Sequence, residues 1–163
     1  SSDVCSSDLA NAHDHPISIA IDHETEQVMV KADIRRVERI MRNLLSNALD
    51  HADEKPILVS VVATQTEVGV GVRDYGSGID PASLSRVFDR FWRADPSRAR
   101  VRGGTGLGLS IALEDARLHN GELDAWGLPG HGAHFVLTLP IVAGNQISGR
   151  PLKPQPKDYP QPI

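Results

Sequence analysis

The sequence predicts an α/β protein of the two-layer kind, an α+β sandwich in which a mixed sheet packs against about three helices. Strand-like and helix-like stretches follow the order β-β-α-β-β-loop-α-β-β, with strand pairs flanking the helices, which disfavours a doubly wound parallel sheet. The chain has 163 residues, 40% of them hydrophobic, enough for one domain with a core. No apolar run approaches the ~18 residues of a membrane span.

The first half of the chain predicts two strands followed by a long helix. Residues 15–22 and 26–33 alternate apolar and polar side chains, as half-buried strands do. Asp33 is a suitable N-cap, and a helix is expected to follow it until about residue 52, before Pro56. The expected apolar stripe of this helix has helical spacing and consists of Ile34, Val37, Met41, Leu44, Leu45, Ala48 and Ala52.

The second half predicts two strand pairs around a loop and a helix. Residues 57–64 and 67–74 alternate as strands joined by a tight turn. Asp80 followed by Pro81 predicts the start of a short helix. Residues 92–104 are polar and basic, which predicts a mobile loop, and a helix is expected over 106–119. The last two strands are expected on either side of residues 127–130.

Both ends of the chain differ in character from the middle. Residues 1–9, "SSDVCSSDL", resemble a translated sequencing adapter; a genuine polar tail is the alternative, and no signal-peptide pattern is present. The lone cysteine, Cys5, lies there, so cysteine chemistry is not expected. Residues 10–140 are expected to form the domain. Residues 141–163 hold five of the eleven prolines and predict a disordered C-terminal tail.

Polar side chains form one stripe along the long predicted helix. Asn43, Asn47, Asp50 and His51 lie at i, i+4, i+7 and i+8, beside the apolar stripe. Carboxamides one turn apart are suited to a metal ion or to phosphate oxygens. The alternative is that these side chains simply face water. A formal net charge of −4 gives no indication of a nucleic-acid-binding face.

Two glycine-containing loops add to this stripe. Asp74 ends a predicted strand and is followed by Gly76 and Gly78, an arrangement that suits either a ligand loop or an ordinary turn. The stretch "GGTGLGLS" at 103–110 opens a helix, where backbone N–H groups favour an anion. It is neither a P-loop nor a dinucleotide fingerprint. Four preceding arginines at 93, 98, 100 and 102 strengthen the phosphate interpretation.

Together these motifs resemble the ATP-binding catalytic domain of sensor histidine kinases. "NLLSNALDH" is similar to the N box, "DYGSGI" to the G1 box, "VFDRFWR" to the F box and "GGTGLGLSIA" to the G2 box. The resemblance covers roughly residues 15–140, and the stretch after the G2 box is most similar to actinobacterial members. It implies a Bergerat-type ATP-binding fold of the GHKL superfamily, with a mobile lid.

The resemblance also implies Mg-ATP as ligand and gives roles to particular residues. Asn47 would hold Mg²⁺, Asn43 would lie near a phosphate, and Asp74 would accept a hydrogen bond from the adenine amino group. Arg93 would reach the γ-phosphate, and Phe88 and Phe91 would anchor the lid. Asp50 stands where many members carry lysine, which makes its role doubtful. The other expected nucleotide contacts are His51, Gly76, Gly78, Ile79, Phe91, Gly104, Thr105, Gly106, Leu107, Gly108 and Leu109.

The implied activity is transfer of the γ-phosphoryl of ATP to a histidine on a separate dimerisation domain, for relay to a response regulator. None of the seven histidines has the context of a phosphoacceptor motif, so the chain alone is not expected to label itself. A cytoplasmic domain of a membrane-anchored parent is implied, without membrane contact of its own. The alternatives are an ATP hydrolase or ATP-gated clamp, and a non-catalytic nucleotide-binding module. Hydrolases of the superfamily carry a glutamate where this chain has Asn43, which favours the kinase.

Overall fold

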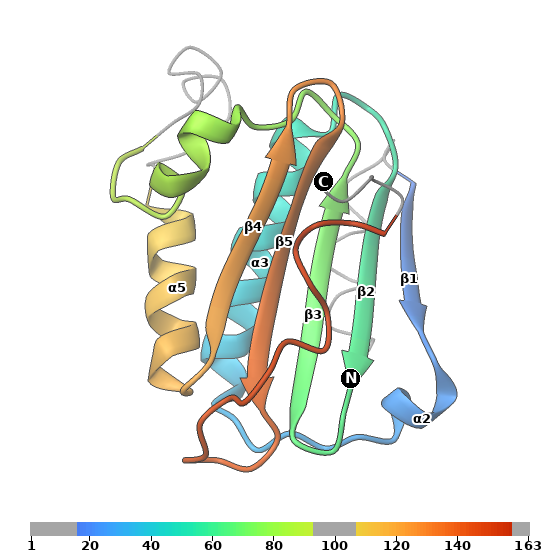
Figure 1. The fold of residues 1–163 in the computed structure, drawn as a ribbon, viewed down its shortest axis with the longest axis vertical. Helices are drawn as coiled ribbons and strands as arrows, with labels where there is room; N and C mark the ends of the chain where they lie inside the picture. The colour runs from blue at the N-terminus through green and yellow to red at the C-terminus, as the bar shows by residue number, and fades with distance from the viewer. Residues whose placement is uncertain (1–15, 93–106, 158–163) are drawn as a thin grey trace.

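A five-stranded mixed sheet forms one layer of the molecule. The computed structural model describes residues 16–92 and 107–157, and the strand order is β1-β2-β3-β5-β4 (Figure 1). β1 (Ile17–Ile21) runs parallel to β2, and the other neighbouring strands are antiparallel. The remaining strands are β2 (Ile57–Ala63), β3 (Glu67–Asp74), β4 (Glu122–Leu128) and β5 (Gly132–Pro140). The α/β sandwich with a mixed sheet is therefore confirmed.

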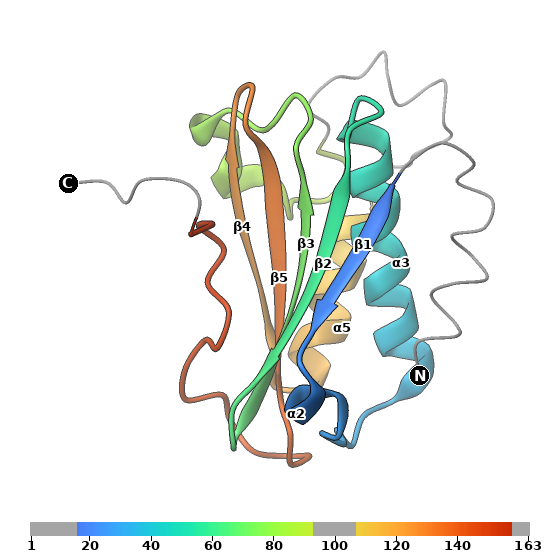
Figure 2. The ribbon, with the colours of Figure 1, turned by 90° about the vertical axis from the view of Figure 1, so that its right-hand side faces the viewer.

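The second layer consists of α3 (Ile34–His51) and α5 (Gly108–Leu118), which lie on one face of the sheet (Figure 2). Two shorter helical pieces, α2 (His23–Glu26) and the 3-10 helix η1 (Pro81–Arg86), connect the larger elements. The core fills the space between the layers. Its fully buried members include Ile40 and Leu44 of α3, Ala112 and Ala116 of α5, and Val72, Phe135 and Leu137 of the sheet.

Both predicted N-caps are confirmed. The Asp33 carboxylate accepts hydrogen bonds from the N–H groups of Arg35 and Arg36 at 3.0 and 3.4 Å. Asp80 accepts one from Ala82 N at 3.0 Å, directly before Pro81. These bonds satisfy N–H groups that have no partner within their helices, so the sequence marks both helix starts.

The predicted strand over 26–33 is wrong. Asp22 caps the short helix α2 by accepting a hydrogen bond from Thr25 N at 2.6 Å, and residues 27–33 are irregular. Val28 and Val30 are partly buried while Met29 is exposed, which explains the misleading alternation. Ile34, expected in the apolar stripe of α3, is 73% exposed at the first position of the helix.

The C-terminal segment also differs from the expectation of a disordered tail. Residues 141–157 leave β5 and run back across the face of the sheet that α3 and α5 do not cover (Figure 2). Ile141 N donates to Thr66 O at 2.9 Å, and Pro156 is buried. Within the described ranges, no helix has both the length and the hydropathy needed to cross a membrane.

Candidate nucleotide-binding site

One pocket lies between the two layers, where β3 ends and α5 begins. Its walls come from α3, the end of β3 and the loop after it, the start of β5, the segment after η1, and α5. The lining residues are Asn47, His51, Asp74, Gly78, Ile79, Val87, Trp92, Leu109, Ala133 and Phe135. The pocket therefore joins residues of all four motifs found in the sequence, and Ala133 and Phe135 of β5 add apolar walls.

The polar stripe of α3 forms one side of this pocket. Asn47 and His51 line it, while Ile40, Leu44 and Ala48 on the neighbouring face of the helix are buried in the core. Asn43 lies one turn earlier, and its Oδ1 would be 3.3 Å from a Cβ placed on Gly108. Asn43 thus faces the first residue of α5. Asp50 is not among the lining residues, which agrees with its doubtful role.

Asp74 is the buried carboxylate of the pocket. It is 1% exposed and ends β3, paired with Ile57 of β2 and Ala133 of β5. Burial raises the pKa of Asp74 above its ordinary value, and the hydrogen bond from Gly76 N to Oδ1, at 3.0 Å, opposes this rise. The other lining residues of this part of the pocket, Ile79, Val87, Ala133 and Phe135, are apolar. A carboxylate in such surroundings gains from a hydrogen-bond donor on a bound molecule.

The two glycines after Asp74 are required by contacts within the chain. A Cβ on Gly76 would collide with the carbonyl oxygen of His51. Gly78 has φ +81°, and its Cβ would collide with the carbonyl oxygen of Leu128. The loop is thus pressed between the C-terminal end of α3 and the end of β4. Its glycines have a packing reason that the sequence does not reveal, beside the ligand role expected for them.

The segment after η1 supplies aromatic side chains, but not the one expected. Phe88 packs edge-to-face on Phe135 with a centroid distance of 6.0 Å, as an anchor would. Phe91, expected to contact the nucleotide, has φ +64° and is 70% exposed, outside the pocket lining. Trp92 lines the pocket instead. Sequence reasoning missed Trp92 together with Val87, Ala133 and Phe135, because apolar pocket walls have the same pattern as core.

The start of α5 presents a polar helix end to the pocket. Leu107 is the N-cap position and makes no side-chain cap bond, and Leu109 lines the pocket. The first N–H groups of such a helix have no partner within the helix and favour an anion. The expected site residues Arg93, Gly104, Thr105 and Gly106, and nearly all of the expected lid, lie outside the described residues.

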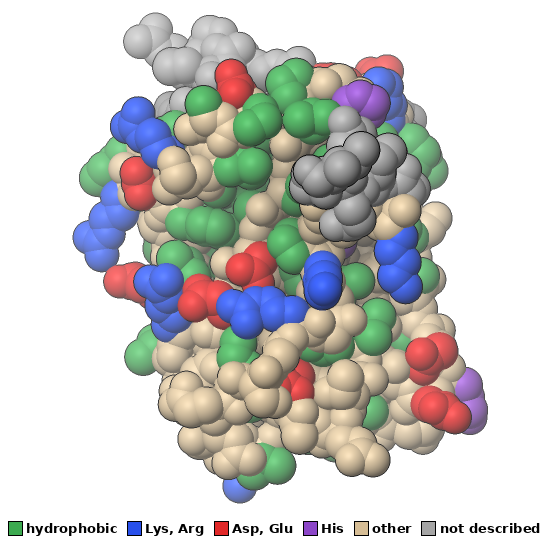
Figure 3. Space-filling view, in the orientation of Figure 1, with side chains coloured by type: hydrophobic (Ala, Val, Ile, Leu, Met, Phe, Trp, Pro, Cys, Tyr) green, Lys and Arg blue, Asp and Glu red, His purple; other side chains and the backbone are tan. Residues whose placement is uncertain are grey.

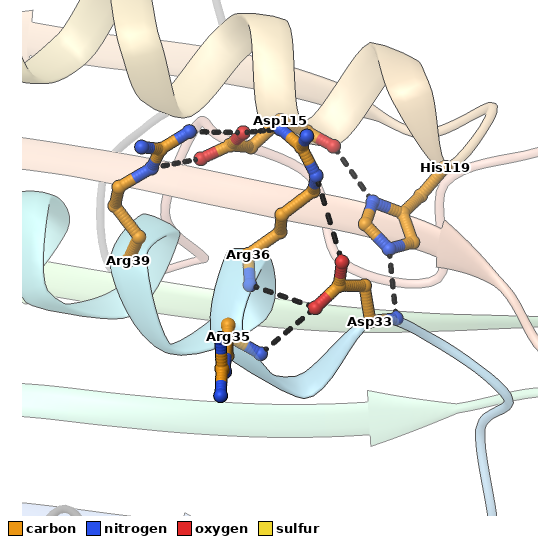
Figure 4. A network of polar contacts seen from close by, with 6 residues as sticks. All are labelled: Asp33, Arg35, Arg36, Arg39, Asp115 and His119. Atoms are coloured by element: carbon orange, nitrogen blue, oxygen red, sulfur yellow. Dashed lines mark hydrogen bonds and ion pairs between the residues drawn. The ribbon is translucent and has the colours of Figure 1, made fainter.

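A charged network holds α3 and α5 together at the end away from the pocket (Figure 4). Asp115 of α5 is 1% exposed and accepts hydrogen bonds from Arg39 at 2.7 and 2.8 Å and from Arg36 at 2.9 Å. The bond with Arg39 contributes most to holding the pKa of Asp115 below its usual range. His119 bridges the two helices through Asp115 O and the N–H of Asp33. The network fixes the helices that carry Asn47 and Leu109 relative to each other.

The groups around the pocket fit a flat, amino-bearing heterocycle linked to phosphates. The buried Asp74 and its apolar neighbours suit the heterocycle, while Asn47, His51 and the start of α5 suit phosphates and a cation at the polar side. Among the described residues, no group of three or more histidine, cysteine, aspartate or glutamate side chains is placed to hold a metal ion.

Fold and pocket agree with the comparisons with known proteins. Residues 32–143 match the family described as histidine kinase-, DNA gyrase B-, and HSP90-like ATPase. The chain belongs to this family. The sensor histidine kinase MtrB of Mycolicibacterium paratuberculosis is 52% identical over 151 residues, which cover 93% of this chain and 27% of that protein. MtrB of Mycobacterium tuberculosis H37Rv is 53% identical over 145 residues, covering 89% of this chain and 26% of that protein.

The chain thus spans about a quarter of the length of these curated relatives and corresponds to their ATPase domain. A full-length ShkA crystal structure in complex with AMPPNP superposes with a TM-score of 0.70 at 25% identity, covering 86% of this chain and 28% of that one. The mycobacterial sensor histidine kinase MprB, at 22% identity and a TM-score of 0.69, shares the fold over 93% of both chains. The resemblance to sensor histidine kinases is confirmed.

Proposed function

We propose that the chain binds Mg-ATP in this pocket and transfers the γ-phosphoryl group to a histidine on a separate dimerisation domain of its parent kinase, for relay to a response regulator. The observation that carries the proposal is the buried Asp74 at the apolar end of a pocket whose other side is lined by Asn47 and Leu109 at the start of α5. The structure of ShkA in complex with AMPPNP supports a nucleotide as the ligand.

Each part of the pocket has one task in this proposal. Asp74 accepts a hydrogen bond from the adenine amino group, and Trp92, Ile79 and Phe135 exclude water around the base. Asn47 holds the magnesium ion, which would neutralise phosphate charge. The N–H groups at the start of α5, together with Arg93, hold the phosphates. Transfer then depends on positioning and charge neutralisation rather than on covalent help from the chain.

The proposal also implies a cellular location for the domain. We infer that it works on the cytoplasmic side of a membrane-anchored parent kinase, where ATP, the acceptor histidine and the response regulator are all available. The domain itself makes no membrane contact in this arrangement.

Nucleotide specificity tests the role of Asp74. Mg-ATP is expected to raise the melting temperature of the unaltered chain more than Mg-GTP does, because a ligand that binds the folded state stabilises it. Asp74→Asn should reduce the ATP response and the difference between the two nucleotides. Asp89→Asn, at an exposed carboxylate, is the matched control. Equal responses to ATP and GTP in the unaltered chain would refute the adenine contact.

A transfer experiment separates kinase from hydrolase. Incubation with γ-labelled ATP should leave the chain unlabelled, whereas addition of the dimerisation domain of the parent kinase should give label on that domain. Hydrolysis by the chain alone should stay near background, because Asn43 is no general base for water. Rapid multiple-turnover hydrolysis that Asn47→Ala abolishes would favour the hydrolase instead.

A further inference from the structure

The sheet has a second face, which no described helix covers, and it holds a groove along β3. The side chains of Val68, Val72 and Asp74 point to the core and pocket side, so the alternate residues point outward. These outward residues are Glu67, Gly69, Gly71 and Arg73. Residues 147–156, the clasp, run in front of the sheet on this face (Figure 1). Two glycines in the middle of a central strand weaken it unless another chain approaches closely there.

One end of the groove holds the clasp through Glu67. This carboxylate is 3% exposed and accepts three hydrogen bonds at Oε1: from Ser148 N at 2.5 Å, Ser148 Oγ at 2.6 Å and Gly149 N at 3.0 Å. Oε2 accepts from the hydroxyls of Thr64 and Thr66. Hydrogen bonds to an ionised acceptor are among the stronger ones in proteins. Glu67 is therefore a specific anchor for the two clasp residues.

The middle of the groove is shaped for Leu152. A Cβ on Gly69 would lie 3.0 Å from Leu152 Cβ, and one on Gly71 would lie 2.8 Å from Leu152 Cδ2 and still closer to His134 Nε2. Gly69 and Gly71 pair in register with Thr138 and Val136 of β5, and both of these are fully inaccessible although no described helix lies on their side. The clasp thus buries apolar surface of the sheet. Ordinary side chains at Gly69 and Gly71 would point outward and keep the clasp away from that surface.

Two further contacts tie the clasp to β4 and β5. Arg150 Nε pairs with Asp124 Oδ2 at 2.6 Å, and the carbonyl oxygen of Pro154 lies 2.6 Å from His134 Nδ1. Acidic and basic side chains lie side by side on this face rather than in separate patches (Figure 3). The clasp therefore contacts β3, β4 and β5 through both charged and apolar side chains.

The clasp ends next to the strand positions that carry the pocket. His134 is the register partner of Arg73, the residue before Asp74. Arg73 is 6% exposed and donates to the carbonyl oxygens of Asp74 and His131, both at 3.1 Å. Its guanidinium lies 4.5 Å from the ring centroid of Tyr75 and 4.9 Å from that of Trp126. A series of neighbours thus runs from the clasp through His134 and its register partner Arg73 to the backbone of Asp74.

We propose that the outer face of the sheet is a binding groove for an extended segment of this chain, residues 147–156, and that seating this clasp braces the end of β3 so that the pocket binds nucleotide more tightly. The first half of the proposal stands on the clasp contacts alone. The second half rests on the proposed function, because it assigns Asp74 to the base. Coupling of this kind requires two arrangements of a packed element, here the seated and the released clasp.

Hydrogen exchange on the full chain tests the seating. The amides of Ser148 and Gly149 should be protected in the unaltered chain, and Leu152→Asn should speed their exchange by about tenfold or more, as expected for local opening. Lys153→Asn, at the exposed neighbouring residue, is the matched control and should leave exchange unchanged. Gly69→Ala is a second release variant, because its methyl group would press on Leu152. Fast exchange in the unaltered chain, or equal exchange in all four proteins, would overturn the groove.

Nucleotide titration of the same proteins tests the brace. Leu152→Asn and Gly69→Ala should weaken Mg-ATP binding by about fivefold, at the lower end of measured coupling between sites, while Lys153→Asn binds as the unaltered chain does. Released clasps with unchanged ATP affinity would overturn the brace but leave the proposed function standing. An unaltered chain that shows no response to ATP would refute the proposed function and the brace with it, whereas exchange would still decide the seating.

Discussion

The two ends of β3 carry two nearly inaccessible carboxylates in opposite situations. Glu67 begins the strand on the outer face, and the clasp and the neighbouring threonines bond both of its oxygens. Asp74 ends the strand on the inner face, with backbone hydrogen bonds from Gly76 and Ala133 and apolar walls around it. The hydrogen bonds from Ser148, followed by those from Thr66 and Gly149, lower the pKa of Glu67 to about 2, whereas burial raises that of Asp74.

The difference in hydrogen bonding separates the two carboxylates by role. The chain itself supplies the donors for Glu67, whereas Asp74 can still gain from a donor on a ligand. Glu67 stabilises the fold because its charge is solvated by the N–H and O–H groups of the chain. Asp74 carries a desolvation cost that the hydrogen bond from Gly76 and the nearby charges offset only in part, and such groups cluster at functional sites. The inner face therefore suits a reversibly bound ligand, and the outer face suits a segment of the chain itself.

The largest expected effect separates the two faces within one strand. Phe135 and Val136 are adjacent on β5, and each is at most 2% exposed, but Phe135 points to the core and Val136 toward the clasp. Phe135→Ala should cost about 3–5 kcal/mol of unfolding free energy, and Val136→Ala about 1–3 kcal/mol. Urea denaturation measures both values.

A variant that releases the clasp tests whether the clasp causes the loss of unfolding free energy in Val136→Ala. In the Leu152→Asn background, Val136→Ala should cost less than half as much, because Val136 would already be exposed to water, whereas the cost of Phe135→Ala should not change. A cost of Val136→Ala that is the same in both backgrounds would mean that something other than the clasp covers this residue.

Local patterns predicted the inner face better than the outer one. The long helix and the β2–β3 and β4–β5 pairs have sustained periodicity, and the caps at Asp33 and Asp80 lie next in sequence to the N–H groups they bond. Residues 26–33 had the right alternation but no neighbouring strand to pair with, so the strand prediction failed. Ile40, fully buried, was left out of the expected stripe.

The clasp was missed because its binding depends on distant partners. Its composition is rich in proline and lacks periodicity, which describes a tail when no partner is known. What holds it is the match of Ser148 to Glu67 and of Leu152 to Gly69, pairs that are about eighty residues apart in the sequence. In the pocket, Asn47, His51 and Asp74 came from motifs, but Phe91, expected as a nucleotide contact, lies outside the lining with a positive φ, and Trp92, which was not expected there, lines the pocket.

The second largest effect concerns the link between the two helices of the inner layer. Asp115→Asn should lower the unfolding free energy by about 1–3 kcal/mol, between the values for surface and buried ion pairs, because Asp115 is buried while Arg36 and Arg39 are about half exposed. Glu114→Gln, at the neighbouring exposed ion pair with Arg90, should change it by less than about 0.5 kcal/mol. Equal effects of the two changes would show that the network adds no stability beyond a surface pair.

Isosteric changes at the two ends of β3 should have opposite signs. Asp74→Asn removes an ionised group from apolar surroundings and should raise the stability of the nucleotide-free chain by about 1 kcal/mol, while reducing its response to ATP. Glu67→Gln weakens the bonds to Ser148 and Gly149 and should lower stability. Melting temperatures without nucleotide give both signs. A loss at both positions would contradict the view that the fold offsets the burial of Asp74 only in part.

The smallest expected effect is a pH dependence confined to the clasp. The pKa of Glu67 falls from an ordinary value of 4.5 in the unfolded chain to about 2 in the folded one, so its contribution is complete above about pH 4.5 and is lost as the pH falls toward 2. Asp74 has a raised pKa and acts in the opposite direction: its contribution is complete at low pH and is lost as the pH rises through the raised value. Acidification should therefore open the outer face before the inner one.

Hydrogen exchange measures this opening. After correction for the intrinsic exchange rate, the amides of Ser148 and Gly149 should lose protection between about pH 4.5 and pH 2, while amides of β3 and β5 stay protected. In Glu67→Gln the same two amides should be poorly protected at every pH, because an amide oxygen does not titrate. Protection of Ser148 and Gly149 that stays constant over this range in the unaltered chain would show that the charge of Glu67 is not what holds the clasp.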